Sequence, residues 1–336
     1  MTQREGDVRG WIRERLGRLR PAPVAPGGTT APAAPVVRIA VVTDSAAALP
    51  PEWVDDVLPA GVLTVVPMPV QIGPDIYSEG DDDLEAALML ALAAGTAVKT
   101  SRPSPGQFER AYQNAAAAGF DAVVSLHISA QLSGTVEAAR LAAGKSSIPV
   151  HVVDTQTVGM VQGYAVQDAV AAAAAGGELD GVSDAAEAAL EHARILFYVP
   201  SLDQLRRGGR IGAAASWLGT VFAIKPILAV RDGVVVPLEK VRTAAKAIAR
   251  LEELVLAEVG SAAGARVRVC IHHFGNEAQA RELAARLQDA SAAVSSIMLS
   301  RLPAVLAAHA GLGVLGVVIT ATTLDSGADP AQVPAR

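Results

Sequence analysis

The chain has 336 residues and a formal net charge of −6, which argues against a nucleic-acid-binding protein, because such a surface needs a basic face. Hydrophobic residues make up 51% of the chain and aromatic residues only 4%, so the interior is built mainly from Ala, Val, Leu and Ile. The length allows two domains of ordinary size. The most apolar stretch, residues 213–230, is interrupted by Lys225-Pro226 before it could span a bilayer.

Residues 1–37 differ from the rest of the chain. The arginine-rich "VRGWIRERLGRLR" has apolar residues near helical spacing, and the Pro/Ala-rich "PAPVAPGGTTAPAAPVV" follows it. We expect a short basic helix on a flexible linker, and a transient membrane-surface contact is one use for it. An unstructured solvated tail is the alternative.

From residue 38 to 195, strand patterns alternate with helix patterns. The expected strands are residues 37–45, 61–72, 120–129 and 148–156, and the expected helices are 81–95, 104–119, 134–144 and 160–177. This alternation is typical of βαβ units, so we predict an N-terminal α/β domain with a mostly parallel sheet.

The pattern changes after residue 195. Asp232-Gly233 between two apolar runs predicts a β-hairpin with a type I′ turn. The other expected elements are a strand and short helix in 195–212, helices at 243–260, 276–290 and 303–311, and strands at 266–274, 294–300 and 313–320. We therefore predict a second, α+β domain over residues 196–322 and a tail over 323–336.

Three strands of the predicted parallel sheet end in hydroxyl or carboxyl groups. These ends are Thr43-Asp44-Ser45, Ser125 through Ser129, and Asp154-Thr155. Ligands of open α/β sheets bind beyond the carboxyl ends of the strands, so this convergence indicates a site.

Ser133-Gly134-Thr135 lies where a strand ends and a helix begins. The Ser133 hydroxyl could cap that helix, or the free N–H groups of the helix start could bind an anion. The stretch lacks the Gly-x-Ser-x-Gly pattern of a nucleophile elbow.

Thr100 and Ser101 form a second polar cluster, held extended by the prolines that follow, although an ordinary ordered loop would look the same.

His309 follows an apolar helical turn, and Gly311 after it could leave room for a ligand beside the imidazole. A buried core histidine is the alternative interpretation.

Other candidates are weaker. "LRRGGRIG" is a poor phosphate-loop candidate, and adjacent His272-His273 face opposite sides of a strand, so we expect no metal site. The single cysteine, Cys270, makes an intramolecular disulfide impossible and fits a cytoplasmic location.

Seven motifs, in order, resemble the DegV family over about residues 38–322. They are "VVTDSAAALP", "KTSRPSPGQF", "HISAQLSGTVEAA", "VVDTQTVGMVQG", "LDQLRRGGRIG", "KPILAVRDGVVVPLEKVRT" and "HAGLGVLGVVI". These are bacterial fatty-acid-binding proteins that include the lipid-carrying subunit of fatty acid kinase. The resemblance implies a two-domain fold with a long-chain fatty acid in the interdomain cleft and a role in phospholipid metabolism.

The resemblance also implies site residues. Thr100, Ser133 and His309 would bind the fatty-acid carboxyl group, and Arg242 would dock the kinase subunit. Supporting positions are Ser101, Ser129, Gly134, Thr135 and Gly311. Ala310 stands where the family usually has Thr, so one hydroxyl near the head group is missing.

This assignment agrees with elementary chemistry. Hydroxyls and an imidazole donate hydrogen bonds to a carboxyl group without burying a full positive charge. Burial of roughly 15 methylenes provides up to about 12 kcal/mol before ordering costs, so the tail dominates affinity.

Two functions follow. The favoured hypothesis is a carrier without turnover of its own and without a cofactor, which binds the fatty acid and presents its carboxyl group to a separate kinase for acyl-phosphate formation. The alternative is a serine-dependent esterase or acyl transferase with Ser133 as nucleophile and His309 as base, although no acid is nominated to orient the imidazole.

Overall fold

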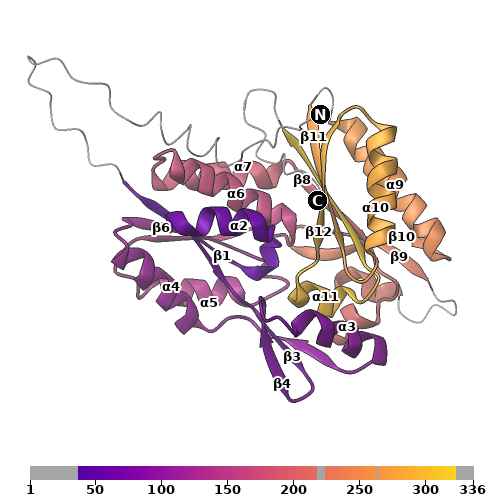
Figure 1. The fold of residues 1–336 in the computed structure, drawn as a ribbon, viewed down its shortest axis with the longest axis horizontal. Coiled ribbons are helices and arrows are strands. Elements are labelled where there is room, and N and C mark those ends of the chain that lie inside the picture. Colours follow the sequence, from indigo (N-terminus) through magenta and orange to yellow (C-terminus); the bar gives the residue numbers. More distant parts are fainter. Residues whose placement is uncertain (1–36, 218–223, 263–264, 323–336) are drawn as a thin grey trace, which may run out of the picture. The chain divides into compact units, whose positions relative to one another are not determined.

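The computed structural model describes residues 37–217, 224–262 and 265–322 (Figure 1). The basic helix and linker expected in residues 1–37 and the tail expected in residues 323–336 lie outside the described residues, apart from Val37. None of the helices in the described ranges combines the length and apolar character that a bilayer crossing requires.

The first sheet is wholly parallel, in agreement with the prediction of a mostly parallel sheet. Its strand order is β2-β1-β6-β7, formed by β1 (Ile39–Asp44), β2 (Leu63–Val66), β6 (Ala122–His127) and β7 (Val150–Asp154). Every residue of β1 and β6 is buried. Central strands covered on both faces need such apolar runs, because neither face meets water.

Helices cover both faces of this sheet (Figure 1). One pair is α4 (Pro105–Ala117) and α5 (Thr135–Ala143), and the other is α6 (Met160–Ala174) and α7 (Leu179–Glu191), with α2 (Pro51–Val57) between β1 and β2 in the chain. The sequence did not indicate α7. Its fully buried residues are Val182, Ser183 and Ala186, and Leu179, Ala189 and Leu190 pack beside them.

The second sheet is mixed, with the order β10-β9-β8-β13-β11-β12, and only its β11–β12 pair is parallel. Its strands are β8 (Ala193–Tyr198), β9 (Lys225–Arg231), β10 (Val234–Val241), β11 (Arg266–His273), β12 (Val294–Arg301) and β13 (Leu315–Thr322). Helices α9 (Ala244–Ser261) and α10 (Glu277–Ala290) pack against it, and α6 contacts β8 and β13. These two sheets confirm the predicted fold class.

The predicted hairpin is present between β9 and β10. Asp232 has φ of 49° and Gly233 has φ of 80°, the pair of positive angles that a type I′ turn requires. The turn lies against the end of the first sheet, since the Ser129 hydroxyl donates to the Gly233 carbonyl at 2.7 Å.

A third, three-stranded sheet was not predicted. Its order is β4-β3-β5, with β3 (Pro69–Ile72), β4 (Asp75–Ser78) and β5 (Val98–Thr100), and α3 (Leu84–Ala94) connects β4 to β5. The strand expected at residues 61–72 is divided between two sheets. Pro67 has no N–H for a ladder, and the next N–H, that of Met68, donates to the Ser45 hydroxyl at 3.1 Å.

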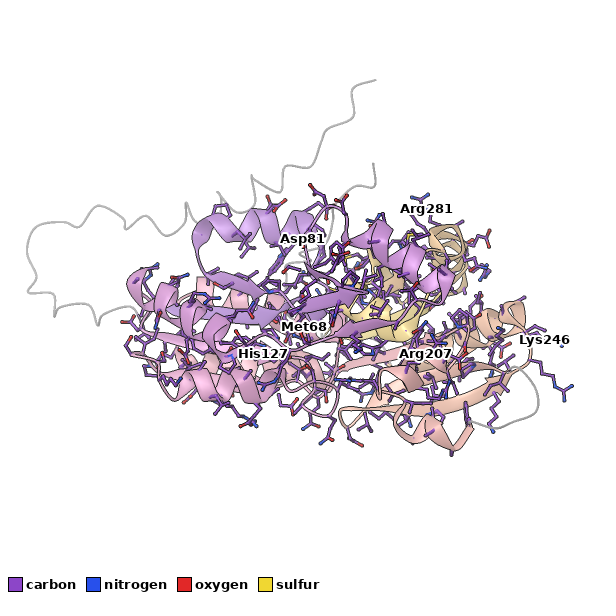
Figure 2. The ribbon with its side chains drawn as sticks, turned by 90° about the horizontal axis from the view of Figure 1, so that it is seen from below. Met68, Asp81, His127, Arg207, Lys246 and Arg281 are labelled. Carbon is purple, nitrogen blue, oxygen red and sulfur yellow. The ribbon has the colours of Figure 1, made fainter. Side chains whose placement is uncertain are left out.

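Short helices complete the fold. They are the 3-10 turns η1 (Ser45–Ala47), η2 (Leu58–Ala60) and η3 (Gly212–Trp217), and the helices α8 (Asp203–Arg207) and α11 (Ala304–Ala310). The charged residues Asp81, Lys246 and Arg281 are exposed, and Figure 2 shows Lys246 and Arg281 near the edge of the molecule, while Met68 and His127 are buried.

Candidate functional site

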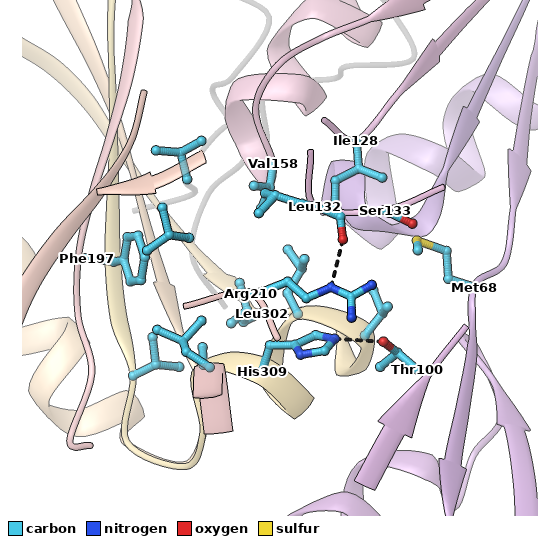
Figure 3. A pocket seen from close by; sticks show the side chains of 18 of the residues that line it. Met68, Thr100, Ile128, Leu132, Ser133, Val158, Phe197, Arg210, Leu302 and His309 are labelled. Atoms are coloured by element: carbon cyan, nitrogen blue, oxygen red, sulfur yellow. Dashed lines mark hydrogen bonds between the residues drawn. The ribbon is translucent and has the colours of Figure 1, made fainter. Parts of the chain in front are cut away.

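A cavity of about 340 Å³ is lined by residues of the second and third sheets and by residues of the segments that follow β6 and β7 of the first sheet (Figure 3). This volume is within the range of roughly 300–1,000 Å³ that small-molecule sites occupy. Most of its wall is apolar: Met68, Ile128, Leu132, Val158, Ile195, Phe197, Leu205, Val230, Val235, Leu302, Val305, Leu306, Ala310 and Val314. An apolar wall of this kind makes no directional polar contacts, so it is suited to a flexible apolar ligand.

Thr100 and His309 meet at one end of this cavity. Thr100 is the last residue of β5, where it pairs with Val70 of β3, and His309 lies near the end of α11. The Thr100 hydroxyl and His309 Nε2 are 2.7 Å apart, although 209 positions separate them in the chain (Figure 3). The structure therefore brings together two of the three predicted carboxyl-binding residues in direct contact.

The imidazole of His309 is neutral near pH 7. Burial lowers the pKa of His309 to about 4, and the positive charge of Arg210 acts in the same direction. His309 Nδ1 is buried, has no hydrogen-bond partner among the described residues, and packs on the backbone of Gly208. A proton on Nδ1 would be an unpaired buried donor, so the proton belongs on Nε2.

This tautomer has a consequence for Thr100. If Nε2–H donates to the Thr100 oxygen, the hydroxyl proton of Thr100 is free to donate to a ligand in the cavity. The His309–Thr100 pair then acts as one oriented donor.

Ser133 also lines the cavity, with Gly134 and Ser101 beside it. The Ser133 hydroxyl is 2.8 Å from that of Thr135 and makes no capping hydrogen bond to α5, whose N-cap is Gly134. The helix-cap interpretation of Ser133 was therefore wrong. Ser101 is exposed, so this end of the cavity reaches the surface.

Three predicted supporting residues do not line the cavity. Ser129 is buried and bonds to the hairpin turn, and Thr135 is buried beneath Ser133. Gly311 has φ of 87° and faces Gln204. Gly208, on the other side of the imidazole, provides the room beside His309 that the sequence had suggested for Gly311: an added Cβ there would overlap with Nδ1.

Sequence reasoning missed Arg210, although it had noted the motif that contains it. Arg210 lines the cavity and is partly buried, and its Nε donates to the Leu132 carbonyl at 2.8 Å (Figure 3). Its Nη1 donates to the Gly208 carbonyl at 2.6 Å. These bonds use two of its five N–H donors. Arg210 thus places a positive charge on the cavity wall that was not expected from the sequence, and the "LRRGGRIG" motif contributes both Arg210 and Gly208.

His272 is a further cavity-lining histidine on β11. Its Nε2 accepts a hydrogen bond from the Met160 N–H at 3.0 Å, and burial lowers its pKa to about 4. The ring therefore holds the first turn of α6. Over the described ranges, no three metal-ligating side chains gather into a possible metal site.

The contacts do not form the pair that an esterase would need. His309 Nε2 bonds to Thr100, and the Ser133 hydroxyl bonds to Thr135. No carboxylate bonds to His309 Nδ1 within the described chain. Arg242, the predicted docking residue, is exposed directly after β10 and lies outside the cavity.

Residues 38–322 match the family model described as an uncharacterised protein of the DegV family. A DegV domain-containing protein of Streptomyces coelicolor is 43% identical over 282 residues, covering 84% of this chain and 98% of the relative. One from Deinococcus radiodurans is 39% identical over 282 residues, covering 84% of this chain and 98% of the relative.

Solved structures agree. A fatty-acid-binding DegV family protein from Thermus thermophilus superimposes with a TM-score of 0.78 at 32% identity, covering 85% of this chain and all of the other. DegV, a fatty acid binding protein from Bacillus subtilis, gives a TM-score of 0.75 at 28% identity, with 85% and 100% covered.

Proposed function

Because this chain belongs to the DegV family, we propose that it binds one long-chain fatty acid, with the carboxyl group at Thr100, Ser133 and His309 and the tail in the apolar cavity. The observation that carries this proposal is the Thr100–His309 pair, 2.7 Å apart at one end of a cavity with otherwise largely apolar walls. Homologous proteins of known structure that bind fatty acids support it.

The polar end is suited to a carboxylate. Thr100 donates through its hydroxyl, and Ser133 and Arg210, which has three further guanidinium donors, also line the cavity. A carboxylate accepts several such hydrogen bonds, and the cation compensates its charge. The donors fix the orientation of the ligand, while each buried methylene adds about 0.8 kcal/mol.

The second part of the proposal is presentation of the carboxyl group to a separate kinase, which makes the acyl phosphate. Ser101 and Arg102 line the polar end and are exposed, so a partner protein can approach the carboxyl group there while the tail stays enclosed. Arg242 is the candidate docking residue. On this proposal the protein is a cytoplasmic carrier and has no turnover alone.

Native mass spectrometry of the protein purified from bacteria tests the binding step. We expect a species heavier by one fatty acid, lost in the Ser133→Ala/His309→Ala double variant. Ser147→Ala/His151→Ala is a matched control, because these two residues are exposed and lie outside the cavity. Uniformly empty wild-type protein with no affinity for added oleate would refute the proposal.

Presentation is tested with ATP and the catalytic subunit of a bacterial fatty acid kinase. Acyl phosphate, trapped with hydroxylamine, should appear only when both proteins are present. Arg242→Ala should lower its rate without changing oleate affinity. Equal rates for Arg242→Ala and wild type would remove Arg242 from the docking surface.

A further inference from the structure

Helix α11 forms one wall of the cavity and contains His309. Four of its seven residues line the cavity: Val305, Leu306, His309 and Ala310. An isolated helix of this length is unstable in water, so the position of α11 is set by its neighbours.

The first turn of α11 is held by Glu79, which is 225 positions away in the chain from the first N–H it binds. Glu79 Oε1 accepts from the Ala304 N–H at 2.9 Å, and Oε2 accepts from the Val305 N–H at 3.4 Å. The N-cap residue, Pro303, makes no capping hydrogen bond. Glu79 is partly buried at the helix start, and this burial raises the pKa of its carboxyl group, partly offset by the two hydrogen bonds.

Both ends of α11 are thus connected to the same small sheet. Glu79 directly follows β4, and Thr100, which bonds to His309 at the other end of α11, is the last residue of β5. Strand β3 lies between β4 and β5, and α11 also contacts β3 and β5. The three-stranded sheet therefore helps to determine where α11 lies, together with α3 and α8, which α11 also contacts.

We propose that Glu79 is a positioning residue of the head-group site: by accepting the N–H groups of Ala304 and Val305, it fixes α11 so that His309 Nε2 meets the Thr100 hydroxyl. Glu79 does not itself line the cavity and acts through α11. This inference deepens the proposed function and rests on it only for the effect on fatty-acid affinity.

The variants separate this role from a general loss of contacts. Glu79→Ala removes both acceptors, whereas Glu79→Gln keeps one acceptor oxygen without the charge. Glu85→Gln is the matched control, because the ion pair of Glu85 with Arg301 joins α3 to the end of β12 at exposed positions.

The first experiment uses ligand-free protein, with side-chain nitrogen NMR of His309 as a function of pH. In wild type and Glu85→Gln we expect a neutral ring with its proton on Nε2. In Glu79→Ala the His309 signals should shift toward those of a solvated imidazole and its pKa should rise toward 6.5, with Glu79→Gln in between. Unchanged His309 signals in Glu79→Ala would overturn the proposal, whether or not the protein binds lipid.

The second experiment is a double-mutant cycle on oleate affinity, measured by displacement of a fluorescent fatty acid. Glu79→Ala should weaken binding roughly 5- to 20-fold in wild type but less than about twofold in the His309→Ala background. The loss in wild type is less than expected for the complete loss of a hydrogen bond to a charged group, because His309 is displaced and not removed. Equal losses in both backgrounds would show that Glu79 does not act through His309. If Glu79→Ala does not fold, Glu79→Gln serves in the same cycle. If wild type binds no oleate, the proposed function fails and the NMR result still decides the role of Glu79.

Discussion

Two hydroxyl–imidazole pairs of this molecule have the same spacing and opposite surroundings. The hydroxyl of Ser125 is 2.7 Å from His127 Nε2 inside the first sheet, and that of Thr100 is 2.7 Å from His309 Nε2 at the cavity. The first pair is completely buried, whereas the second lines an open space.

Each member of the buried pair has a further hydrogen-bond partner. Asp44 Oδ2 is 3.0 Å from His127 Nδ1 and also accepts from the Ile128 N–H at 3.0 Å, and the Tyr112 hydroxyl is 2.9 Å from that of Ser125. An acid, an imidazole and a serine are therefore in hydrogen-bonded order, as in a hydrolase triad. Ser125, however, is wholly inaccessible and cannot attack a substrate.

The difference shows that a catalytic triad needs both a hydrogen-bonded acid, imidazole and hydroxyl and a hydroxyl that a substrate can reach. Asp44, His127 and Ser125 are hydrogen-bonded in this order but no substrate can reach them, so their role is to join β1 to β6. A ligand in the cavity can reach the Thr100–His309 pair, but no acid orients its imidazole. A neutral, oriented donor in a cavity is suited to binding a ligand, and the variants below test this contrast.

The largest expected effect is on stability, at Asp44. Asp44→Ala leaves His127 and two backbone N–H groups without their buried partner, so we expect the free energy of unfolding to fall by about 3–5 kcal/mol. Urea denaturation measures it.

Asp154→Ala is the control for that variant. Asp154 also ends a strand and accepts from two backbone N–H groups, those of Ala130 and Gln156, but it is only half-buried and bonds to no histidine. We expect a loss of about 1 kcal/mol. Equal losses for the two variants would contradict the role given to the buried network.

The next effect is on binding, at Gly208. In Gly208→Ala the new methyl group would overlap with His309 Nδ1, so the imidazole must move away from Thr100. We expect oleate affinity to fall about 10- to 100-fold, the equivalent of losing a hydrogen bond to a charged group. Calorimetry with oleate provides the measurement.

Gly181→Ala is a matched glycine control in α7, where an added Cβ meets nothing within 4 Å. Its affinity should equal that of wild type. If Gly208→Ala also binds like wild type, the position of the imidazole does not matter for the ligand.

The smallest effect is the pH dependence of stability from His309. Its pKa is lowered to about 4 in the folded state, while the unfolded chain titrates near 6.5. Between these values the unfolded state binds the extra proton, so stability is lost as the pH falls from about 6.5 to about 4. Over that window the free energy of unfolding of wild type should fall by about 1 kcal/mol per pH unit more than that of His309→Asn. Urea denaturation at several pH values measures this difference. Parallel curves would mean that the imidazole is solvated.

Most of the fold could be predicted from the sequence because its elements are signalled locally. Apolar runs marked β1 and β6, and Asp232-Gly233 marked the hairpin. The three-stranded sheet was missed because its strands have three or four residues each and pair only through contacts between distant segments. Such short strands carry no clear period.

Candidate residues of the site could be named from the sequence, but their contacts could not, because these also join distant segments. Thr100, Ser133 and His309 could be named as candidates from polar groups in apolar surroundings and from the family motifs. Sequence spacing could not show that Thr100 contacts His309 rather than Ser133, or that Gly208 faces the imidazole. Arg210 was passed over because a cation in an arginine-rich loop usually points to solvent.

The hairpin turn has a consequence for sequence variation. Asn often replaces Gly in type I′ turns because it tolerates positive φ. At Gly233 a Cβ would also lie 2.6 Å from the Ser129 oxygen, so tolerance of the backbone angle is not sufficient there. In a library of random variants, position 233 should accept only glycine for as long as position 129 keeps its hydroxyl, and an alanine at 129 should relax that restriction.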